Sequence, residues 1–362
     1  MRILLIDEAY PLNTRNTKIL HSLSKRLERA ETHVLTWDRQ GDFKEGEPGW
    51  NYHIYTQAAA YGNKWDKLKG LFGYRKFCRT VLKELCPDII IVSHWNNLLM
   101  LSGVDYRRQM VIYENLDAPT GPWLGRKFLN MIERHFMRRI ALTVHASRFY
   151  TDIYPKRYPQ YVLENKPTIN TTNASYAPKK PLRIVYLGNI RYIDILQNLT
   201  DAVRGHDHLQ LLFHGGGPDF QTLLTYTKGM PNVVCTGPYQ YSQIEDFYHH
   251  ADIIWAAYPN RDFNVRYAIS NKFHESIAFG VPAIFAEKTM LASFATEKNI
   301  GCAVDPYDAK AIEALLLHMA DKKETLEAMH HALLAQQKEE TSWEEDFDGL
   351  MEQITKLMHK QS

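Results

Sequence analysis

The sequence predicts an α/β fold of two domains, each built around a parallel sheet. The chain has 362 residues, more than one hydrophobic core usually holds, so two domains of about 150–200 residues are expected. Short apolar runs rich in Ile, Val and Leu alternate with amphipathic segments, which is the pattern of βαβ units. A hydrophobic fraction of 45% and a charged fraction of 23% are ordinary for a globular protein.

The expected strands are continuous apolar runs, as strands buried on both faces of a parallel sheet should be. They lie at 2–6, 32–37, 88–94, 110–115, 141–147, 183–189, 209–217, 232–237, 252–258 and 282–287. Helices are expected between them at 17–29, 74–85, 123–139 and 244–250, and a last one at 343–360 has apolar residues at helical spacing.

A segment rich in Pro, Asn, Thr and Ser, residues 166–182, separates two similar series of strands and helices. It lacks any sustained apolar period and is typical of an interdomain linker. We therefore expect an N-terminal domain at 1–168 and a C-terminal domain at 169–342, both Rossmann-like.

The cysteines give no sign of a disulfide framework or a metal site. The four of them are far apart, without a CxxC pair or a histidine cluster at ligand spacing: Cys78, Cys86, Cys235 and Cys302. The apolar run at 3–6 is too short for a signal peptide or a membrane span. We expect a cytoplasmic protein, with no cofactor and no metal.

The net charge of +2 hides an asymmetry between the two halves. Residues 1–180 hold 28 Lys/Arg against 17 Asp/Glu, a net of +11, so the remainder is at −9. Either the basic half meets an anionic partner, or the two domains differ in composition without a functional reason. Nucleic acid is not the expected partner, because no recognition motif accompanies the charge.

Within the basic half, residues 63–83 contain seven Lys/Arg and one Asp, interleaved with aromatic and aliphatic side chains. Such a segment suits the face of an anionic membrane. The alternative is an amphipathic core helix whose polar face is basic. A second basic cluster comprises Arg126, Lys127, Arg134, Arg138 and Arg139.

Two stretches of the second half carry candidate ligand-binding residues. Gly188 ends an expected strand, where glycine lets the backbone approach a ligand, and Arg191 follows with a guanidinium suited to phosphate. A strand that ends in glycine is also common in any α/β protein.

The most specific stretch is 270–282, SNKFHESIAFGVP. Ser270, Asn271 and Lys272 lie at an expected helix start, where free backbone N–H groups favour a diphosphate. Glu275, one turn later, suits the hydroxyls of a ribose. The alternative is a surface salt bridge between Lys272 and Glu275.

In this order of motifs the sequence resembles the GT-B glycosyltransferases, especially glycosyltransferase family 4 and related bacterial polysaccharide enzymes. The second half carries the resemblance through YLGNIR, FHGGGPDF, NVVCTGPY, IEDFYHHADIIWAAY, SNKFHESIAFGVPAI and GCAVDPYDAKAIEALL. The first half is similar more loosely, through PDIIIVSH, ALTVHASRFY and VLENKP. The resemblance implies two Rossmann-like domains, a last helix that packs on the first domain, and a nucleotide-sugar donor bound mainly by the second.

The resemblance assigns roles to residues in the second half. It places Glu275 at the donor ribose, Lys272 and Arg191 at the diphosphate, and the backbone around Tyr239 at the nucleobase. Many members carry another acid eight residues before the ribose-binding one, in contact with the donor sugar. That position is Tyr267 here, so the resemblance fixes neither the sugar nor the stereochemistry.

Candidates for the acceptor side lie at strand ends of the first half. Asp117 is the first choice for the base of an inverting reaction and Glu114 the second, although each is also typical of a loop or helix cap. In a retaining reaction the resemblance implies that the donor phosphate is the base. His94, Asn13 and Arg15 are further candidates, for acceptor or phosphate contacts.

The function expected from the sequence is a metal-independent transfer of sugar from a UDP- or GDP-sugar to a glycan or lipid-linked acceptor. The pathway implied by the resemblance is bacterial surface polysaccharide synthesis, with the protein peripheral on the inner face of the plasma membrane. The alternatives are a sugar-nucleotide epimerase of the same fold and a catalytically silent nucleotide-binding subunit.

Overall fold

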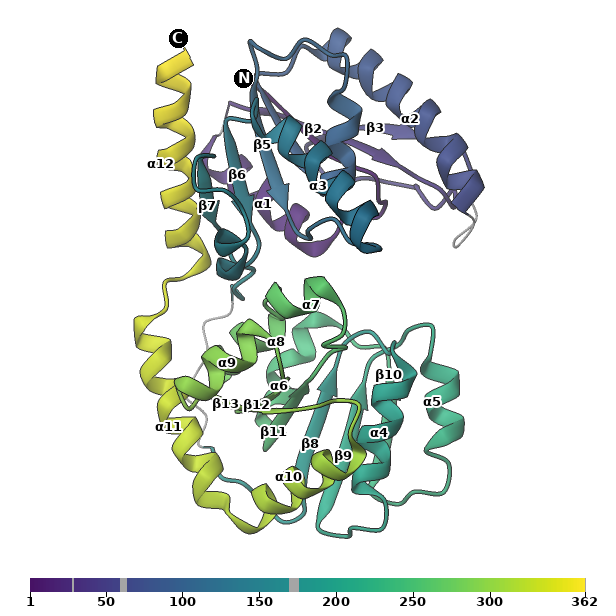
Figure 1. The fold of residues 1–362 in the computed structure, drawn as a ribbon, viewed down its shortest axis with the longest axis vertical. Helices are drawn as coiled ribbons and strands as arrows, with labels where there is room; N and C mark the ends of the chain where they lie inside the picture. Colours follow the sequence, from purple (N-terminus) through teal and green to yellow (C-terminus); the bar gives the residue numbers. More distant parts are fainter. Residues whose placement is uncertain (28, 59–63, 169–175, 362) are drawn as a thin grey trace. The chain divides into compact units, whose positions relative to one another are not determined.

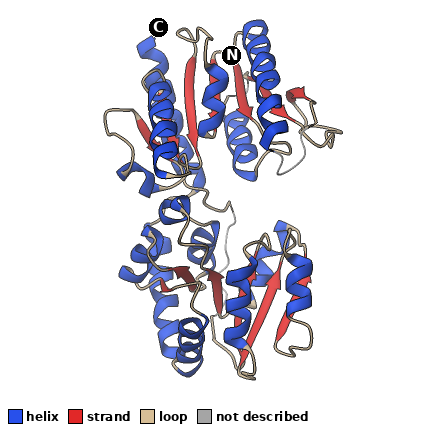
Figure 2. Cartoon of the chain, turned by 45° about the vertical axis from the view of Figure 1, so that its right-hand side comes forward, coloured by secondary structure: helices blue, strands red, loops and turns tan. Residues whose placement is uncertain are grey.

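The structure is a computed structural model that describes residues 1–27, 29–58, 64–168 and 176–361, without the side chains of 64–69, 360 and 361. It divides into two compact units, which are described separately below. Unit 1 comprises Met1–Glu164 and Trp343–Ser362, and unit 2 comprises Asn165–Ser342. Each unit contains a parallel sheet with helices packed against it (Figures 1 and 2).

The sheet of unit 1 has the strand order β3-β2-β1-β4-β5-β6-β7, with parallel pairing throughout. Its strands are β1 (Arg2–Asp7), β2 (Glu31–Trp37), β3 (Trp50–Tyr55), β4 (Ile89–Ser93), β5 (Met110–Asn115), β6 (Leu142–His145) and β7 (Gln160–Val162). The helices are α1 (Thr14–Arg26), α2 (Lys64–Leu85), α3 (Trp123–Met137) and α12 (Trp343–Gln361), with the short 3-10 helices η1 (Trp95–Leu101) and η2 (Arg148–Asp152).

Helix α12, drawn in yellow in Figure 1, packs on unit 1 although it ends the chain. Its apolar stripe, which includes Trp343 and Phe347, joins the core formed by α1 and the strands. The indole N–H of Trp343 donates to the Ser22 hydroxyl of α1 at 2.9 Å. The Arg26 guanidinium donates to Glu344 at 2.7 Å. Buried apolar area and these polar contacts together hold the last helix on α1.

The sheet of unit 2 has the order β10-β9-β8-β11-β12-β13, again parallel. Its strands are β8 (Leu182–Leu187), β9 (Leu209–His214), β10 (Val233–Gly237), β11 (Ile253–Ala256), β12 (Ala283–Ala286) and β13 (Gly301–Val304). The helices are α4 (Ile193–Val203), α5 (Phe220–Tyr226), α6 (Ile244–His249), α7 (Phe263–Tyr267), α8 (Asn271–Phe279), α9 (Met290–Glu297), α10 (Ala309–Asp321) and α11 (Lys323–Glu339), with η3 (Tyr241–Gln243).

These two parallel sheets confirm the predicted fold class. The boundary between the units in the sequence lies between Glu164 and Asn165, whereas the sequence predicted it between residues 168 and 169. Part of the expected linker, 169–175, lies outside the described residues. Among the described residues, no helix combines the length and the hydrophobicity that crossing a bilayer requires.

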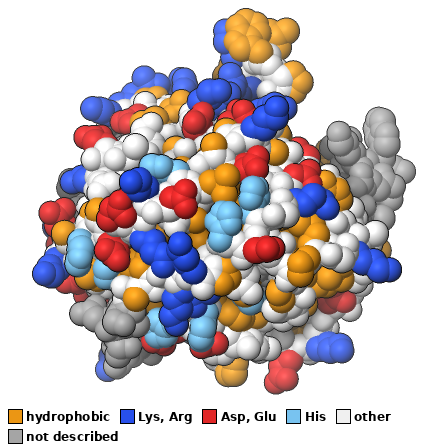
Figure 3. Space-filling view, turned by 90° about the horizontal axis from the view of Figure 1, so that it is seen from below, with side chains coloured by type: hydrophobic (Ala, Val, Ile, Leu, Met, Phe, Trp, Pro, Cys, Tyr) orange, Lys and Arg blue, Asp and Glu red, His pale blue; other side chains and the backbone are white. Residues whose placement is uncertain are grey.

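The face drawn in Figure 3 mixes basic, acidic and histidine side chains.

Candidate functional site

Each unit gathers polar side chains at the carboxyl edge of its sheet, where ligands bind in doubly wound folds. In unit 2 the central element is α8. The Ser270 hydroxyl caps it by accepting from the Lys272 backbone N–H at 3.1 Å, and Gly280 ends it with φ 67°. The left-handed conformation at Gly280 is the usual helix stop, since glycine adopts it without steric cost.

Lys272 and Glu275 form an ion pair in the interior of unit 2. The Lys272 Nζ donates to Glu275 Oε2 at 2.6 Å, and the Tyr248 hydroxyl donates to the same oxygen at 2.8 Å. Lys272 is 7% exposed and Glu275 3%. The alternative interpretation, that Lys272 and Glu275 form a salt bridge on the surface, is therefore wrong. Burying both charges costs desolvation energy that can exceed the attraction between them, so the pair need not stabilise the fold.

The other candidates of unit 2 surround this pair. Burial raises the pKa of Tyr239, while the Lys272 charge lowers it and the Glu275 charge raises it. Burial likewise raises the pKa of Tyr258, which bonds to the Ser270 side chain and feels the charge of Arg191. These interactions bring Arg191, Tyr239, Ser270, Lys272 and Glu275 into one neighbourhood. Asn271 is more peripheral: it is exposed, and its Oδ1 accepts from Asn165 Nδ2 at 3.1 Å.

The glycines after β8 and β9 allow two loops to approach each other. Gly188 has φ 127°, and a Cβ there would meet nothing within 4 Å, so its surface is open. Gly215 has φ 151°, and a Cβ on it would lie 1.7 Å from the Gly188 carbonyl oxygen. A Cβ on Gly217 would lie 2.1 Å from Asn189 Oδ1. The FHGGGP stretch thus brings the loop after β9 against the loop after β8.

Sequence reasoning missed Tyr248 and Tyr258 as members of this site. Tyr258 follows the carboxyl end of β11. Its position just after an expected strand is the feature of the sequence that could have identified it. Tyr248 lies inside α6, and nothing local points to its bond with Glu275. Tyr267 ends α7, half-buried, with its ring 5.1 Å from that of Phe263.

In unit 1 the carboxyl edge holds a second buried ion pair. Arg15 Nε donates to Glu114 Oε1 at 2.5 Å, and the two residues are 4% and 1% exposed. Both Nη atoms of Arg15 are buried without a hydrogen-bond partner among the described residues. Glu114 is therefore held by Arg15, whereas Asp117 lies half-buried in the loop after β5. Of the two candidate bases, Asp117 is the more accessible.

A hydrogen-bond network connects this edge across β1, β4 and β5. Asn16 Nδ2 donates to Asp7 Oδ2 at 2.7 Å and to the Ser93 hydroxyl at 2.8 Å. Asn13 caps α1 by accepting from the Asn16 N–H at 2.8 Å. The His94 N–H donates to the Glu114 carbonyl at 3.1 Å. Asp7, which sequence reasoning did not single out, is fully buried as the last residue of β1.

Burial raises the pKa of Asp7, and the neighbouring His94 lowers it. His94 itself has φ 66°, a left-handed conformation that a non-glycine residue rarely adopts. Asn13, Arg15, His94 and Glu114 thus lie along one edge of the unit 1 sheet, as the parallel topology requires. Among the residues with a defined placement, no group of His, Cys, Asp or Glu has the arrangement of a metal site.

Comparison with known proteins gives a family match within the second unit and a fold for the chain. Residues 181–322 match the family described as "Glycosyl transferases group 1". No curated protein matches the chain. Sucrose-phosphate synthase from Thermosynechococcus elongatus has a similar structure at 13% identity, with a TM-score of 0.74 and 100% of both chains covered.

Two further solved structures are similar along almost the whole chain. Anabaena HepE in complex with UDP has 12% identity and a TM-score of 0.71, covering 98% of this chain and 100% of that one. The lipopolysaccharide outer core galactosyltransferase WaaB has 13% identity and a TM-score of 0.62, covering 97% of this chain and 99% of that one. The chain therefore has the GT-B fold, and residues 181–322 of its second unit match the group 1 glycosyltransferases.

Proposed function

We propose that this protein transfers a sugar from a UDP- or GDP-sugar to a glycan or lipid-linked acceptor in the synthesis of a bacterial surface polysaccharide such as capsule, exopolysaccharide or lipopolysaccharide. The buried Lys272–Glu275 pair at the start of α8 is the observation that carries the proposal. The similarity to HepE, solved with UDP, and to WaaB, a lipopolysaccharide galactosyltransferase, supports the donor class and the pathway.

The donor would bind at the carboxyl edge of unit 2. Lys272 and Tyr248 both donate to Oε2 of Glu275, and we assign the other oxygen, Oε1, to the ribose hydroxyls. The diphosphate would lie at the N-terminus of α8, near Lys272 and the exposed Arg191. We assign the nucleobase to the backbone around Tyr239.

Sugar transfer requires that the charge of the departing nucleoside diphosphate be stabilised. We propose that Lys272, Arg191 and the backbone N–H groups of α8 do this without a metal ion. Lys272 is already held by Glu275 in a fixed position, so little reorganisation is needed when charge develops.

The acceptor hydroxyl must lose a proton during transfer. If the reaction inverts, we assign that proton to Asp117, and the pairing with Arg15 gives Glu114 a positioning role at the edge of unit 1. If it retains, the donor phosphate takes the proton and Asp117 orients the acceptor. The anomeric configuration of the product distinguishes the two cases.

Turnover of UDP- and GDP-sugars by matched variants tests the proposal. Asp117→Asn is expected to lower kcat by about 10²–10⁴ in the inverting case, which is the range for loss of a general base. Asp105→Asn is the control, because Asp105 is an exposed acid of the same unit, paired with Arg107. Transfer that survives Asp117→Asn and Glu114→Gln alike would contradict the catalytic assignment.

The same experiment distinguishes the alternative functions. An epimerase would convert the sugar nucleotide without an acceptor. A silent subunit would be stabilised by a nucleotide yet turn over no sugar donor.

We place the protein at the inner face of the plasma membrane, as expected for a lipid-linked acceptor. For the segment 63–83, Asn63 and the side chains of 64–69 lie outside the described residues. The remainder of α2 forms a groove of about 310 Å³ that includes Lys76 and Lys83. Two of its arginines, Arg75 and Arg79, donate to backbone carbonyls of the neighbouring loop. Its inner face, with Tyr74 and other apolar residues, is buried, so α2 has in part the character of a basic core helix.

A further inference from the structure

Helix α3 presents a large apolar face that no described element covers. Trp123 is 60% exposed, Leu124 72%, Phe128 57% and Met131 59%. At 100° per residue these four side chains lie on one side of the helix. The opposite side carries the buried residues, such as Phe136. Four large apolar side chains grouped on one exposed helix face indicate an interaction surface, because isolated apolar residues are the usual case.

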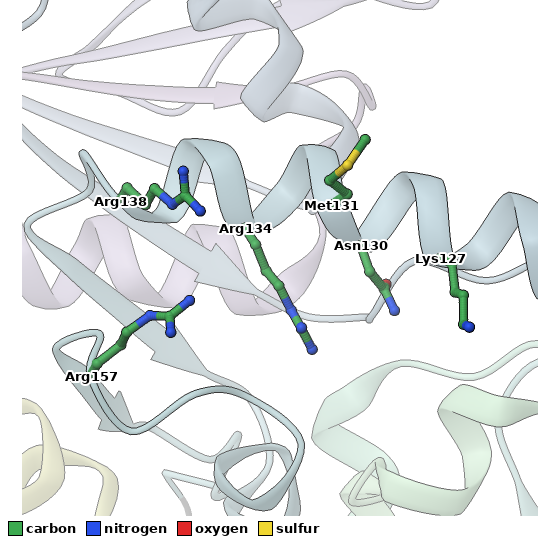
Figure 4. Close-up of a pocket in the computed structure, with 6 residues that line it drawn as sticks. All are labelled: Lys127, Asn130, Met131, Arg134, Arg138 and Arg157. Atoms are coloured by element: carbon green, nitrogen blue, oxygen red, sulfur yellow. The ribbon is translucent and has the colours of Figure 1, made fainter.

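A basic groove adjoins this apolar face. It has a volume of about 460 Å³ and is lined by Lys127, Asn130, Met131, Arg134, Arg138 and Arg157. In Figure 4, Lys127, Asn130 and Arg134 extend from the same side of α3, and Arg157 reaches toward the helix from a separate segment. None of these lining residues is acidic. Four cations without a counter-charge in the lining fit phosphate groups.

We propose that α3 docks this protein on a bilayer that contains anionic phospholipid. Trp123, Leu124 and Phe128 enter the boundary between headgroups and acyl chains, and the basic groove binds the lipid phosphates. This combination of inserted aromatic and aliphatic side chains with flanking Lys and Arg is what an interfacial helix requires. The positive charge of the groove favours an anionic lipid surface over a neutral one.

The position of α3 in the chain suggests what membrane docking would achieve, and this step rests on the proposed function. Helix α3 follows β5 through the short loop that contains Asp117. The apolar residues lie in its first turns, on the side of the carboxyl edge that carries Glu114. A bilayer bound there would present a lipid-linked acceptor close to the candidate base.

Co-sedimentation with vesicles tests the docking surface. Wild-type protein is expected to bind vesicles of phosphatidylcholine with phosphatidylglycerol and to bind pure phosphatidylcholine much more weakly. Arg134→Gln/Arg138→Gln should weaken binding to the anionic vesicles about twenty-fivefold, since each cation near such a surface contributes about fivefold. Leu124→Ser/Phe128→Ser should weaken it about tenfold or more, through lost apolar burial.

The matched control is Arg107→Gln/Arg108→Gln, which removes the same charge from exposed positions before the amino end of β5. It should leave vesicle binding within about threefold of wild type. Equal losses in both arginine pairs, or wild-type protein that does not prefer anionic vesicles, would overturn the proposal. Nucleotide-induced stabilisation should be unchanged in all these variants, so failure of the docking surface and failure of the donor site are read separately.

Discussion

Replacing Glu275 by alanine should destabilise unit 2 strongly. The substitution leaves the Lys272 ammonium, 7% exposed, without its partner at 2.6 Å, and it removes the acceptor of the Tyr248 hydroxyl. Breaking one side of a buried ion pair costs about 3–5 kcal/mol. For a unit of this size, spanning Asn165–Ser342, each kcal/mol lowers the Tm by about 2–4 °C, so we expect a decrease of about 6–20 °C.

The double variant Lys272→Met/Glu275→Leu separates stability from function. It replaces both charges by apolar side chains, a change that is often neutral or stabilising, so its Tm should return close to that of wild type. Calorimetry with and without the stabilising nucleotide measures both effects, and the nucleotide should shift neither variant. A wild-type Tm in Glu275→Ala would refute the energetic reasoning. A nucleotide shift that persists in the folded double variant would refute the donor role.

Three other predictions concern stability. Burial raises the pKa of Glu133 from 4.5 to about 7, so ionising this carboxyl is harder in the folded protein than in the unfolded chain. The free energy of unfolding should therefore be highest below pH 4.5 and fall by about 3 kcal/mol as the pH rises through 7. Glu133→Gln should flatten the pH profile of the Tm, and identical profiles would count against this. Gly215→Ala should cost more than about 3 kcal/mol, because a Cβ there overlaps a carbonyl oxygen, whereas Gly205→Ala faces open space at φ 77° and should cost about 1 kcal/mol. Arg15→Met should cost about 3–5 kcal/mol in urea unfolding, and Arg15→Met/Glu114→Leu should recover most of it; an unchanged urea midpoint in the single variant would contradict the pairing.

Most of the strands were predictable because they are buried on both faces. The apolar run at 88–94, for example, contains β4 (Ile89–Ser93), whose five residues are all buried. Strand β3 (Trp50–Tyr55) was missed because it lies at the sheet edge and is only partly buried, so polar residues interrupt its apolar pattern. Strand β7 (Gln160–Val162) has only three residues, too few for a periodic signal.

The candidate site was predictable where its residues are close in sequence. The spacing of Lys272 and Glu275 places them one helical turn apart, and the structure pairs them. Their burial was not predictable, because it depends on Tyr248 and on the packing of α6 against α8. Nor was the partner of Arg15, since 99 residues separate it from Glu114. Such contacts arise from the sheet topology, which brings distant strand ends to one edge.

Thermal unfolding in the presence of UDP, GDP, CMP and their sugars is the most direct test of the central claim, that unit 2 binds a nucleotide-sugar donor through Lys272 and Glu275. We predict that one nucleotide family stabilises the wild-type protein, by about 2.7 kcal/mol at a hundredfold excess over Kd, and does not stabilise Lys272→Met/Glu275→Leu. No stabilisation of the wild type by any nucleotide, or equal stabilisation of both proteins, would contradict the claim.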